Sequence, residues 1–391
     1  MLPGVTIEIQ NGALGQTAQT ADGVCGMVLQ GAAPTGLTIG TSAQIFSLAQ
    51  AEALGITSSY DSTNSVRVWR HIKEFYAEAG TGAELWIMIV SQALSQATIV
   101  DNTQNYAKKL LNDANGRIKL LGVCRSPAAG YTPTVTAQID ADVIAALATG
   151  QVLADAFAAA YKPVRIVLDG YAFTGTTSTL SDLKLQTKNR CAVLIGNTEN
   201  RANTAVGLLL GRLGKDPVQR NPGRVKSGSL AGMTAAYLGT ATLESLEASI
   251  TAIHDKGYIT LRRHIGKAGY YFTDAPTAAP ATDDYNNLMN GRVIDKATVL
   301  AYSVYVDQIL DEIEIDVATG KLAPQVVKYY QGLIETAITN AMGGEISGAA
   351  VRIDPAQNVL ATGKLVVELR ITPVGYAREL VVQLGLNNPS N

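Results

Sequence analysis

The sequence has little charge and no excess of either sign. Asp, Glu, Lys and Arg make up 16% of its 391 residues, against about 25% in an average soluble chain. The formal net charge of -2 argues against electrostatic binding of nucleic acid by the whole chain. A hydrophobic content of 47% excludes intrinsic disorder, which needs high charge and few apolar residues. The length predicts two or three domains, and the weakly charged surface predicts extensive cover by partner molecules.

Cysteine and histidine are too few and too scattered for the usual disulfide or metal frameworks. The three cysteines, Cys25, Cys124 and Cys191, include no CxxC pair, which excludes a disulfide scaffold and a zinc ribbon. Cys124 and Cys191 stand in apolar runs, so both are predicted to lie reduced in the core. The three histidines form no HExxH pair, and neither a metal site nor any cofactor is expected.

No lysine or arginine precedes Arg67, and no apolar run reaches 18 residues. A secretory or transit peptide needs a basic start, so none is expected at the beginning of this sequence. The nearest approach to a membrane span is the Ala-rich stretch 143–161, which Asp155 interrupts. Membrane insertion is therefore not predicted.

Residues 37–210 contain short apolar runs that alternate with helical patterns. Such runs are typical of strands that are buried on both faces. The predicted strands are Glu84–Val90, Ile118–Val123, Val164–Asp169 and Cys191–Ile195. Helices are predicted between or beside them at 66–79, 102–113 and 139–161. Strands separated by helices predict a mostly parallel α/β sheet.

The first 36 residues are small and polar and contain one strand signature. Val5, Ile7 and Ile9 alternate with polar residues, which is typical of a half-buried strand. Asn11-Gly12 then marks a turn. A lone strand on a tether cannot bury its own apolar face, so we expect it to join a sheet in this chain or in another.

Residues 211–230 are predicted to form a loop rich in glycine, proline and basic side chains. Its candidate binding residues are Arg220, Arg224 and Lys226. The basic stretch contains no aromatic residue, so base stacking on nucleic acid is not supported. Two interpretations stay open, a solvated loop and a docking surface for an acidic neighbour. Beyond the loop, Tyr258–His264 and Tyr270–Thr273 predict a hairpin.

Residues 291–391 predict a separate α+β unit. Apolar stripes at helical spacing run from Ile294 to Ile313 and from Val326 to Ala341, with a turn between them. Alternating strands follow at 365–372 and 380–386. The apolar face of the last strand consists of Leu380, Val382, Leu384 and Leu386. Like the strand near the N-terminus, this strand has no obvious partner.

A motif for nucleophilic catalysis matches only weakly. Residues 40–43, Gly-Thr-Ser-Ala, are similar to the nucleophile segment of subtilisin-type proteases. That family places its Asp and His before the Ser, whereas here the first histidine, His71, follows Ser42. Ser42 is better interpreted as the N-cap of a helix that begins near Ala43.

Two further motifs have simpler structural interpretations. Residues 207–216 lack the first Gly of a P-loop and the Ser or Thr that should follow Lys215, so they predict a helix that ends at glycine. Acidic residues near 311–316 predict a solvated helix face rather than a cation site. These acids are Asp311, Glu312, Glu314 and Asp316. No catalytic role is expected for Ser42, His71 or Lys215.

The C-terminal third carries a distinctive order of short motifs. They are Asn290–Ala297, Glu314–Asp316 with Thr319-Gly320, Met342–Ile346 and Ile353–Lys364, with two long helices between them and two strands after them. The most specific part is Asp354-Pro355 with Gln357-Asn358 and Thr362-Gly363. By this order the chain resembles the contractile tail sheath proteins of phages, bacteriocin-like particles and injection systems. Residues 3–7 are similar to a sheath N-terminal arm.

The resemblance implies a structural subunit without enzymatic activity. Sheath subunits form hexameric rings that stack in a helix around an inner tube, and their N- and C-terminal arms add strands to sheets of neighbouring subunits. The implied partners are further copies of the chain, the inner tail tube protein, and baseplate and tail terminator proteins. The implied location is the virion tail or an equivalent contractile particle, after synthesis in the bacterial cytoplasm. Phage, bacteriocin-like particle and injection system are not separated by these residues.

The resemblance also implies a division of the chain. We expect an N-terminal arm and linker at 1–36, an α/β middle (outer) domain at 37–230, an α+β C-terminal (inner) sheath domain at 231–378, and a C-terminal arm strand at 379–391. Two alternatives stay open. One is an α/β hydrolase or nucleotide-binding enzyme, and the other is a non-contractile tube or baseplate component.

Overall fold

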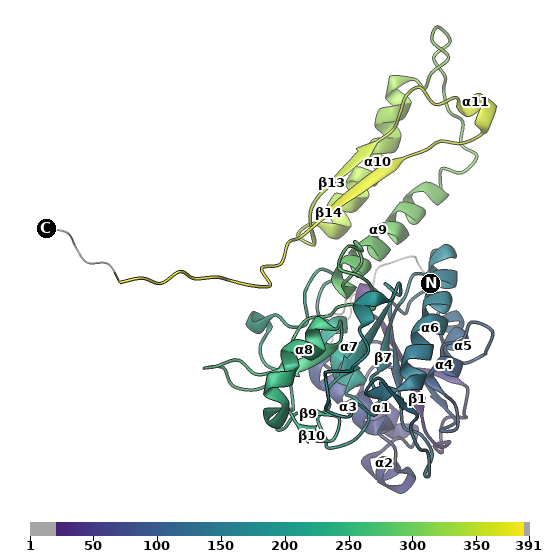
Figure 1. Cartoon of the computed structure of the whole chain (residues 1–391). Helices are drawn as coiled ribbons and strands as arrows, with labels where there is room; N and C mark the ends of the chain where they lie inside the picture. Colours follow the sequence, from purple (N-terminus) through teal and green to yellow (C-terminus); the bar gives the residue numbers. More distant parts are fainter. Residues whose placement is uncertain (1–20, 387–391) are drawn as a thin grey trace, which may run out of the picture. The chain divides into compact units, whose positions relative to one another are not determined.

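The computed structural model describes residues 21–386, so the expected strand at Val5–Ile9 lies outside the described residues. The described chain divides into two compact units between Ile309 and Leu310. The first is an α/β domain built around one large sheet, and the second is a smaller α+β unit (Figure 1).

The large sheet has eight strands in the order β12-β11-β8-β7-β4-β1-β3-β2. The six central strands run parallel, and β2 and β12 pair antiparallel at the two edges. Their bounds are β1 Cys25–Gln30, β2 Ser42–Ile45, β3 Leu85–Val90, β4 Leu120–Cys124, β7 Arg165–Asp169, β8 Cys191–Ile195, β11 Ile259–Arg262 and β12 Tyr271–Phe272. The four strands predicted from apolar runs are confirmed as β3, β4, β7 and β8, and the predicted hairpin is confirmed as β11 and β12.

Helices cover both faces of this sheet. Gly122 of β4 lies in register with Val167 of β7 and packs against α7, whereas Ile166 points to the other face and packs against α6. The helices of the first unit are α1 Leu48–Ala53, α2 Ser58–Asn64, α3 Val68–Ala79, α4 Gln96–Ile99, α5 Ala107–Asp113, α6 Ala141–Ala159, α7 Val206–Lys215, α8 Ile250–Asp255 and α9 Leu288–Val306. Because both faces are covered, every residue of β1, β4, β7 and β8 is buried.

Short elements complete the first unit. They are the strand pairs β5 Val135–Thr136 with β6 Ile139–Asp140 and β9 Tyr237–Leu238 with β10 Ala241–Thr242, and the 3-10 helices Ala21–Gly23, Leu183–Leu185, Val225–Ser227 and Glu244–Ser249. All three cysteines are buried and unpaired, as predicted for Cys124 and Cys191. Burial raises the pKa of the Cys25 and Cys191 thiols to about 12.

Helix α6 contains most of the Ala-rich stretch 143–161, the part of the sequence that is most similar to a membrane span. Within residues 21–386, it is the helix that is long and apolar enough to cross a membrane by length and composition alone. In the domain it packs against β7 and β8, and it buries Val143, Leu147, Leu153 and Phe157. Core helices of α/β proteins have the same composition.

Helix α7 crosses α3 at van der Waals distance because glycine lines the crossing. A Cβ on Gly207 would lie 2.1 Å from the carbonyl oxygen of His71, and one on Gly211 would lie 2.5 Å from that of Phe75. The prediction of a helix over this motif is confirmed, but the expected end at glycine is wrong. The helix continues to Lys215, because its glycines serve close packing rather than termination.

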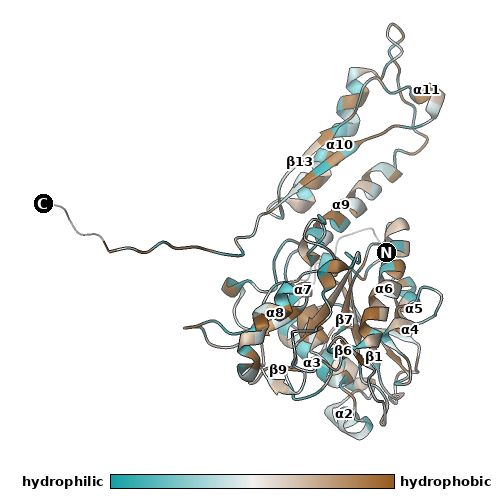
Figure 2. Ribbon diagram, viewed as in Figure 1, coloured by the Kyte–Doolittle hydropathy of each residue, from teal (hydrophilic) through white to brown (hydrophobic). Residues whose placement is uncertain are grey.

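The second unit packs one helix on a two-stranded sheet. Helix α10 Pro324–Met342 lies against β13 Ile346–Arg352, which pairs antiparallel with β14 Glu368–Pro373, and a short helix α11 Val359–Thr362 precedes β14. One stripe of α10 provides the core. Its members are Tyr330, Ile334, Ile338 and Met342. Figure 2 shows apolar residues interspersed with polar ones along this helix and these strands.

Three local predictions are wrong. Ser42 does not cap a helix but begins strand β2, and the following helix starts at Leu48 with Ser47 as its cap. Residues 25–30, expected in the N-terminal linker, form β1 near the middle of the sheet. The first predicted C-terminal helix ends at Val306, before Ile309 and Ile313.

The compact units also divide the chain at a different place from the expected domains. Strands β11 and β12 and helix α9 all belong to the first unit, so its boundary lies at 309 and not at 230. The reason is that β11 pairs in parallel with β8, which fixes residues 259–262 in the large sheet.

Candidate assembly interface

The two-stranded sheet of the second unit has open edges. In the described part of the chain, β13 pairs with β14 and with no further strand. Helix α10 covers one face, where the Gln331 side-chain amide donates to the carbonyl of Val351 at 3.3 Å. A strand edge presents unpaired N–H and C=O groups that serve as a template for another strand. A sheet of two strands on one helix is therefore a ready acceptor.

The chain after β14 forms no strand within the described residues, although its pattern predicts one. Residues 374–386 have no regular secondary structure and leave their large apolar side chains in solvent. The exposed fractions are 82% for Leu380, 81% for Val382, 95% for Leu384 and 106% for Leu386. Val381, on the opposite face of an extended chain, is 76% exposed. This segment and the open sheet have the complementary chemistry of a donated strand and its acceptor.

The motif Asn290–Ala297 forms the first half of α9, which seats on the amino ends of the large sheet. Asn287 caps the helix by accepting from the amide of Asn290 at 2.8 Å. The buried guanidinium of Arg165, at the start of β7, donates to both carboxylate oxygens of Asp295 at 2.6 and 2.9 Å and to the carbonyl of Gly291 at 3.0 Å. A Cβ on Gly291 would lie 2.5 Å from the Arg165 Cζ, so this position requires glycine.

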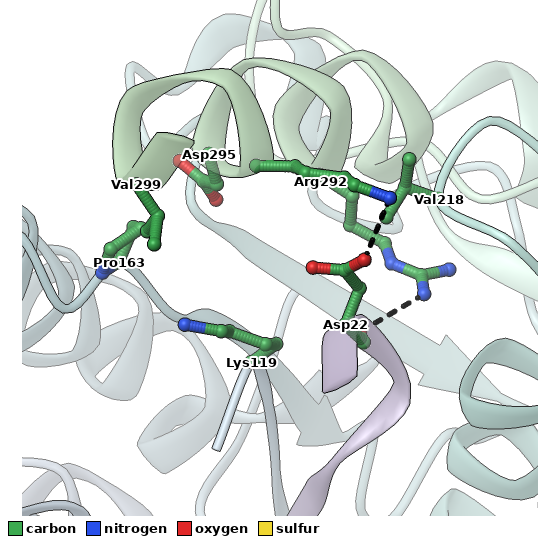
Figure 3. A pocket seen from close by; sticks show the side chains of 8 residues that line it. Asp22, Lys119, Pro163, Val218, Arg292, Asp295 and Val299 are labelled. Carbon is green, nitrogen blue, oxygen red and sulfur yellow. Dashed lines mark hydrogen bonds and ion pairs between the residues drawn. The ribbon is translucent and has the colours of Figure 1, made fainter. Parts of the chain in front are cut away.

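A small pocket beside this seat is lined by charged side chains of both signs (Figure 3). Lys296 Nζ lies 2.9 Å from Asp22 Oδ2, and Arg292 donates to the backbone carbonyls of Asp22 and Asp216. Burial lowers the pKa of Lys119, which lines the same pocket. Sequence reasoning identified this motif as characteristic but missed Arg165 as its partner. The available signal was an arginine inside the apolar run of β7.

The carboxyl ends of the parallel strands, where α/β enzymes bind substrates, carry a buried polar network. Asp169 ends β7 and accepts from the amides of Arg125 and Thr204 at 3.1 and 3.0 Å. Burial nevertheless raises the pKa of Asp169 to about 7. Gln30 ends β1 and accepts from the amide of Ser126 at 2.8 Å. These side chains hold the loops that follow the strands.

The residues considered for catalysis lie on separate elements. Ser42 on β2 donates to Asp113 at 2.7 Å, and His71 is buried on α3. His71 accepts from the amide of Gly207 at 3.4 Å, and burial lowers its pKa well below the ordinary value. Lys215 is the last residue of α7.

The sequence predicted that the acids near 311–316 lie on a helix face. They lie instead in the irregular chain before α10. Asp316 Oδ1 accepts from the amides of Ala318 and Thr319 and so closes the turn, and Glu314 accepts from Gln325 at 2.8 Å. Among residues 21–386, no group of three or more His, Cys, Asp or Glu side chains is placed to hold a metal ion.

The predicted basic loop at 211–230 begins within helix α7 and continues as a partly exposed loop. Arg212, expected in the loop, is buried in α7 and donates to both carboxylate oxygens of Glu78 at 2.7 and 3.0 Å. Arg220 forms an ion pair with Asp216 at 3.1 Å. Arg224 and Lys226 are exposed.

Comparison with protein families covers almost the whole chain. Residues 2–276 match the DUF2586 N-terminal domain, and residues 284–391 match the DUF2586 C-terminal domain. The chain belongs to the DUF2586 family. No curated protein sequence matches this DUF2586 chain.

Solved structures give the fold of the DUF2586 chain. It is similar to a chain of the anti-feeding prophage (AFP) baseplate, with a TM-score of 0.66, 15% identity and 99% of each chain covered. It is also similar to a chain of the contracted AFP helical sheath, with a TM-score of 0.62, 14% identity and 99% of each chain covered. A third similar structure is a chain of the contracted PVC sheath complex, from an extracellular contractile injection system. Its TM-score is 0.60 at 12% identity, with 99% of this chain and 98% of that chain covered.

These likenesses extend over both units of the DUF2586 chain, so the resemblance noticed in its C-terminal third holds for the whole fold. The fold is that of sheath proteins from contractile particles, with a large mixed sheet and helices on both faces.

Proposed function

We propose that this protein is a structural subunit of a contractile sheath. Its copies polymerise as stacked hexameric rings around an inner tube, and contraction of the polymer drives the tube through a target cell envelope. The role is structural rather than enzymatic. Its partners are further copies, the tube protein and the baseplate and terminator proteins that bound the polymer, and its place is the tail or an equivalent contractile particle.

The observation that carries this proposal is the pairing of features in the second unit. The sheet of β13 and β14 has open edges, and the segment after it exposes Leu380, Val382, Leu384 and Leu386 at every second position. If each copy donates this strand to one neighbour and accepts a strand from another, the growing polymer always keeps one free strand and one free sheet edge. Further copies can therefore be added. Residues 5–9, with their alternating Val5, Ile7 and Ile9, are proposed as the second donated strand.

Electron microscopy of the purified full chain tests the proposal. We expect hollow filaments built of stacked rings, and we expect deletion of residues 379–391 to leave folded monomers that form no long filaments. The large apolar side chains that the structure describes in this segment are 76–106% exposed, so the thermal melting temperature of the deletion variant should match that of the complete chain. Dispersed monomers of the complete chain with a hydrolytic activity would refute the sheath function.

A further inference from the structure

The edge of the large sheet at β12 carries a concentrated positive charge. Five exposed cations lie there, at the end of β11, in the loop that joins β11 to β12 and in the loop that runs beside it. They are Arg224, Lys226, Arg262, Arg263 and Lys267, which we call the basic edge. The carboxylate of Glu244 offsets one of these charges by accepting from Arg263 at 3.4 Å.

Backbone contacts hold the two loops of the basic edge together. The amide of Leu230 donates to the carbonyl of Tyr270 at 2.8 Å, and a Cβ on Gly269 would lie 2.5 Å from the Ser229 side chain. Gly223 packs equally closely on the backbone of residues 272–273. The two loops that carry the cations therefore lie side by side, although Arg224 and Arg262 are 38 positions apart in the numbering.

An apolar side chain stands among these cations. Ile265, in the loop between β11 and β12, is 107% exposed. The outer edge of β12 pairs with no other strand in the described part of the sheet. An exposed apolar side chain in a loop that also bears cations suits a partner surface that combines acidic and apolar residues.

The chain itself contains a segment of the opposite chemistry. Residues 310–317 bear four carboxylates and no cation, and we call them the acidic segment. Two of its apolar side chains are fully in solvent, Leu310 at 99% and Val317 at 103% exposure. The net charge of the basic edge, with Glu244 included, is equal and opposite to that of the acidic segment.

We infer that the basic edge of one copy binds the acidic segment of a second copy. The contact joins two different surfaces, so each copy keeps one free surface of each kind and the chain of contacts continues. This inference rests on the proposed sheath function, in which copies of the chain polymerise. It adds a contact that is sensitive to salt, which strand exchange alone does not provide. Ile265 packs between the apolar side chains of the acidic segment in this contact.

Charge reversal in two variants tests the inference. The first variant makes the basic edge acidic with Lys226→Glu, Arg262→Glu and Lys267→Glu. The second makes the acidic segment basic with Asp311→Lys, Glu312→Lys and Glu314→Lys, and it keeps Asp316 because that carboxylate closes the turn. Each variant alone should lose filament formation at low ionic strength, as measured by sedimentation and electron microscopy.

Mixing the two variants makes the test specific for a contact between copies. In an equimolar mixture, the acidic edge of the first variant meets the basic segment of the second, and the unaltered acidic segment meets the unaltered basic edge. Filaments should therefore return in the mixture. As a matched control, Lys73→Glu, Lys109→Glu and Arg201→Glu change the same number of charges elsewhere on the first unit and should leave filament formation intact.

Each failure has a separate signature. If the unaltered chain forms no filaments, the proposed sheath function fails. If the unaltered chain and both variants form filaments equally, the sheath function stands and the inferred contact is wrong. Loss in both variants without rescue in the mixture also contradicts the inferred contact, provided that both variants melt at the temperature of the unaltered chain.

Discussion

The alternation in the C-terminal segment allows a sharp test of strand donation. If residues 380–386 enter a neighbour's sheet, Val382 faces the acceptor's core side and Val381 faces the opposite side. We predict that Val382→Asp weakens assembly and that Val381→Asp, one position away and chemically identical, is tolerated. Both side chains are in solvent in the single chain, at 81% and 76% exposure. Neither change should therefore alter the melting temperature of the monomer.

The size of the expected effect follows from burial. Full burial of a valine side chain contributes about 1.5–3 kcal/mol, and this contribution is lost when an aspartate replaces it. A factor of ten in affinity corresponds to about 1.4 kcal/mol, so the loss alone weakens each strand contact roughly 10- to 100-fold. Desolvation of the new carboxylate adds several kcal/mol, as a general order of magnitude. The critical concentration for assembly should rise by at least about tenfold for Val382→Asp.

The assay is sedimentation over a series of protein concentrations, with filaments confirmed by electron microscopy. Equal critical concentrations for Val382→Asp and Val381→Asp would refute the reasoning, because a donated strand must distinguish its two faces. A lower melting temperature for Val382→Asp would also refute it, since that result would place the side chain in the core of its own subunit.

Three further predictions concern stability. Asp295→Ala leaves Arg165 buried without its carboxylate and should lower the free energy of unfolding by about 3–5 kcal/mol in urea titrations, with a smaller loss for Asp295→Asn. Gly207→Ala should cost about 1–3 kcal/mol because its Cβ meets a carbonyl of α3, whereas Gly332→Ala, with open space around it on α10, should gain about 0.5–1 kcal/mol. Burial raises the pKa of Asp169 to about 7 from its ordinary 3.8, so the folded state holds a proton that the unfolded chain has released. The contribution of Asp169 to the free energy of unfolding should therefore fall as the pH rises from about 4 to about 7, and Asp169→Asn should remove this contribution from the pH profile.

The local pattern of the sequence was sufficient for most of the first unit. Runs such as Leu85–Val90 and Cys191–Ile195 are strands that both helix layers cover, so an unbroken apolar run is enough to identify them. The alternation of such runs with helical patterns was also enough to identify the parallel α/β class. The helix over residues 324–342 could be predicted because helical periodicity is set by the backbone within a few residues.

Strands β1 and β13 escaped prediction because their patterns are broken by small residues. Gly26 interrupts β1, where a Cβ would lie 2.8 Å from the side chain of Ile118, so the absence of a side chain makes room for that isoleucine. In β13, Gly348 and two alanines dilute the apolar alternation of Ile346–Arg352. In both cases the strand is stabilised by its neighbours in the sheet rather than by its own periodicity.

Pairings between distant residues were decided by the tertiary structure alone. Arg165 and Asp295 are 130 positions apart, and nothing in either local sequence specifies the other. The basic edge arises in the same way, from two loops that share a surface only because Leu230 and Tyr270 are hydrogen-bonded. The alternation of Leu380–Leu386 was legible in the sequence, but the structure was needed to show that these side chains stay in solvent in the single chain. Periodicity encodes which face of an element is apolar, whereas only the packed fold determines whether anything covers that face.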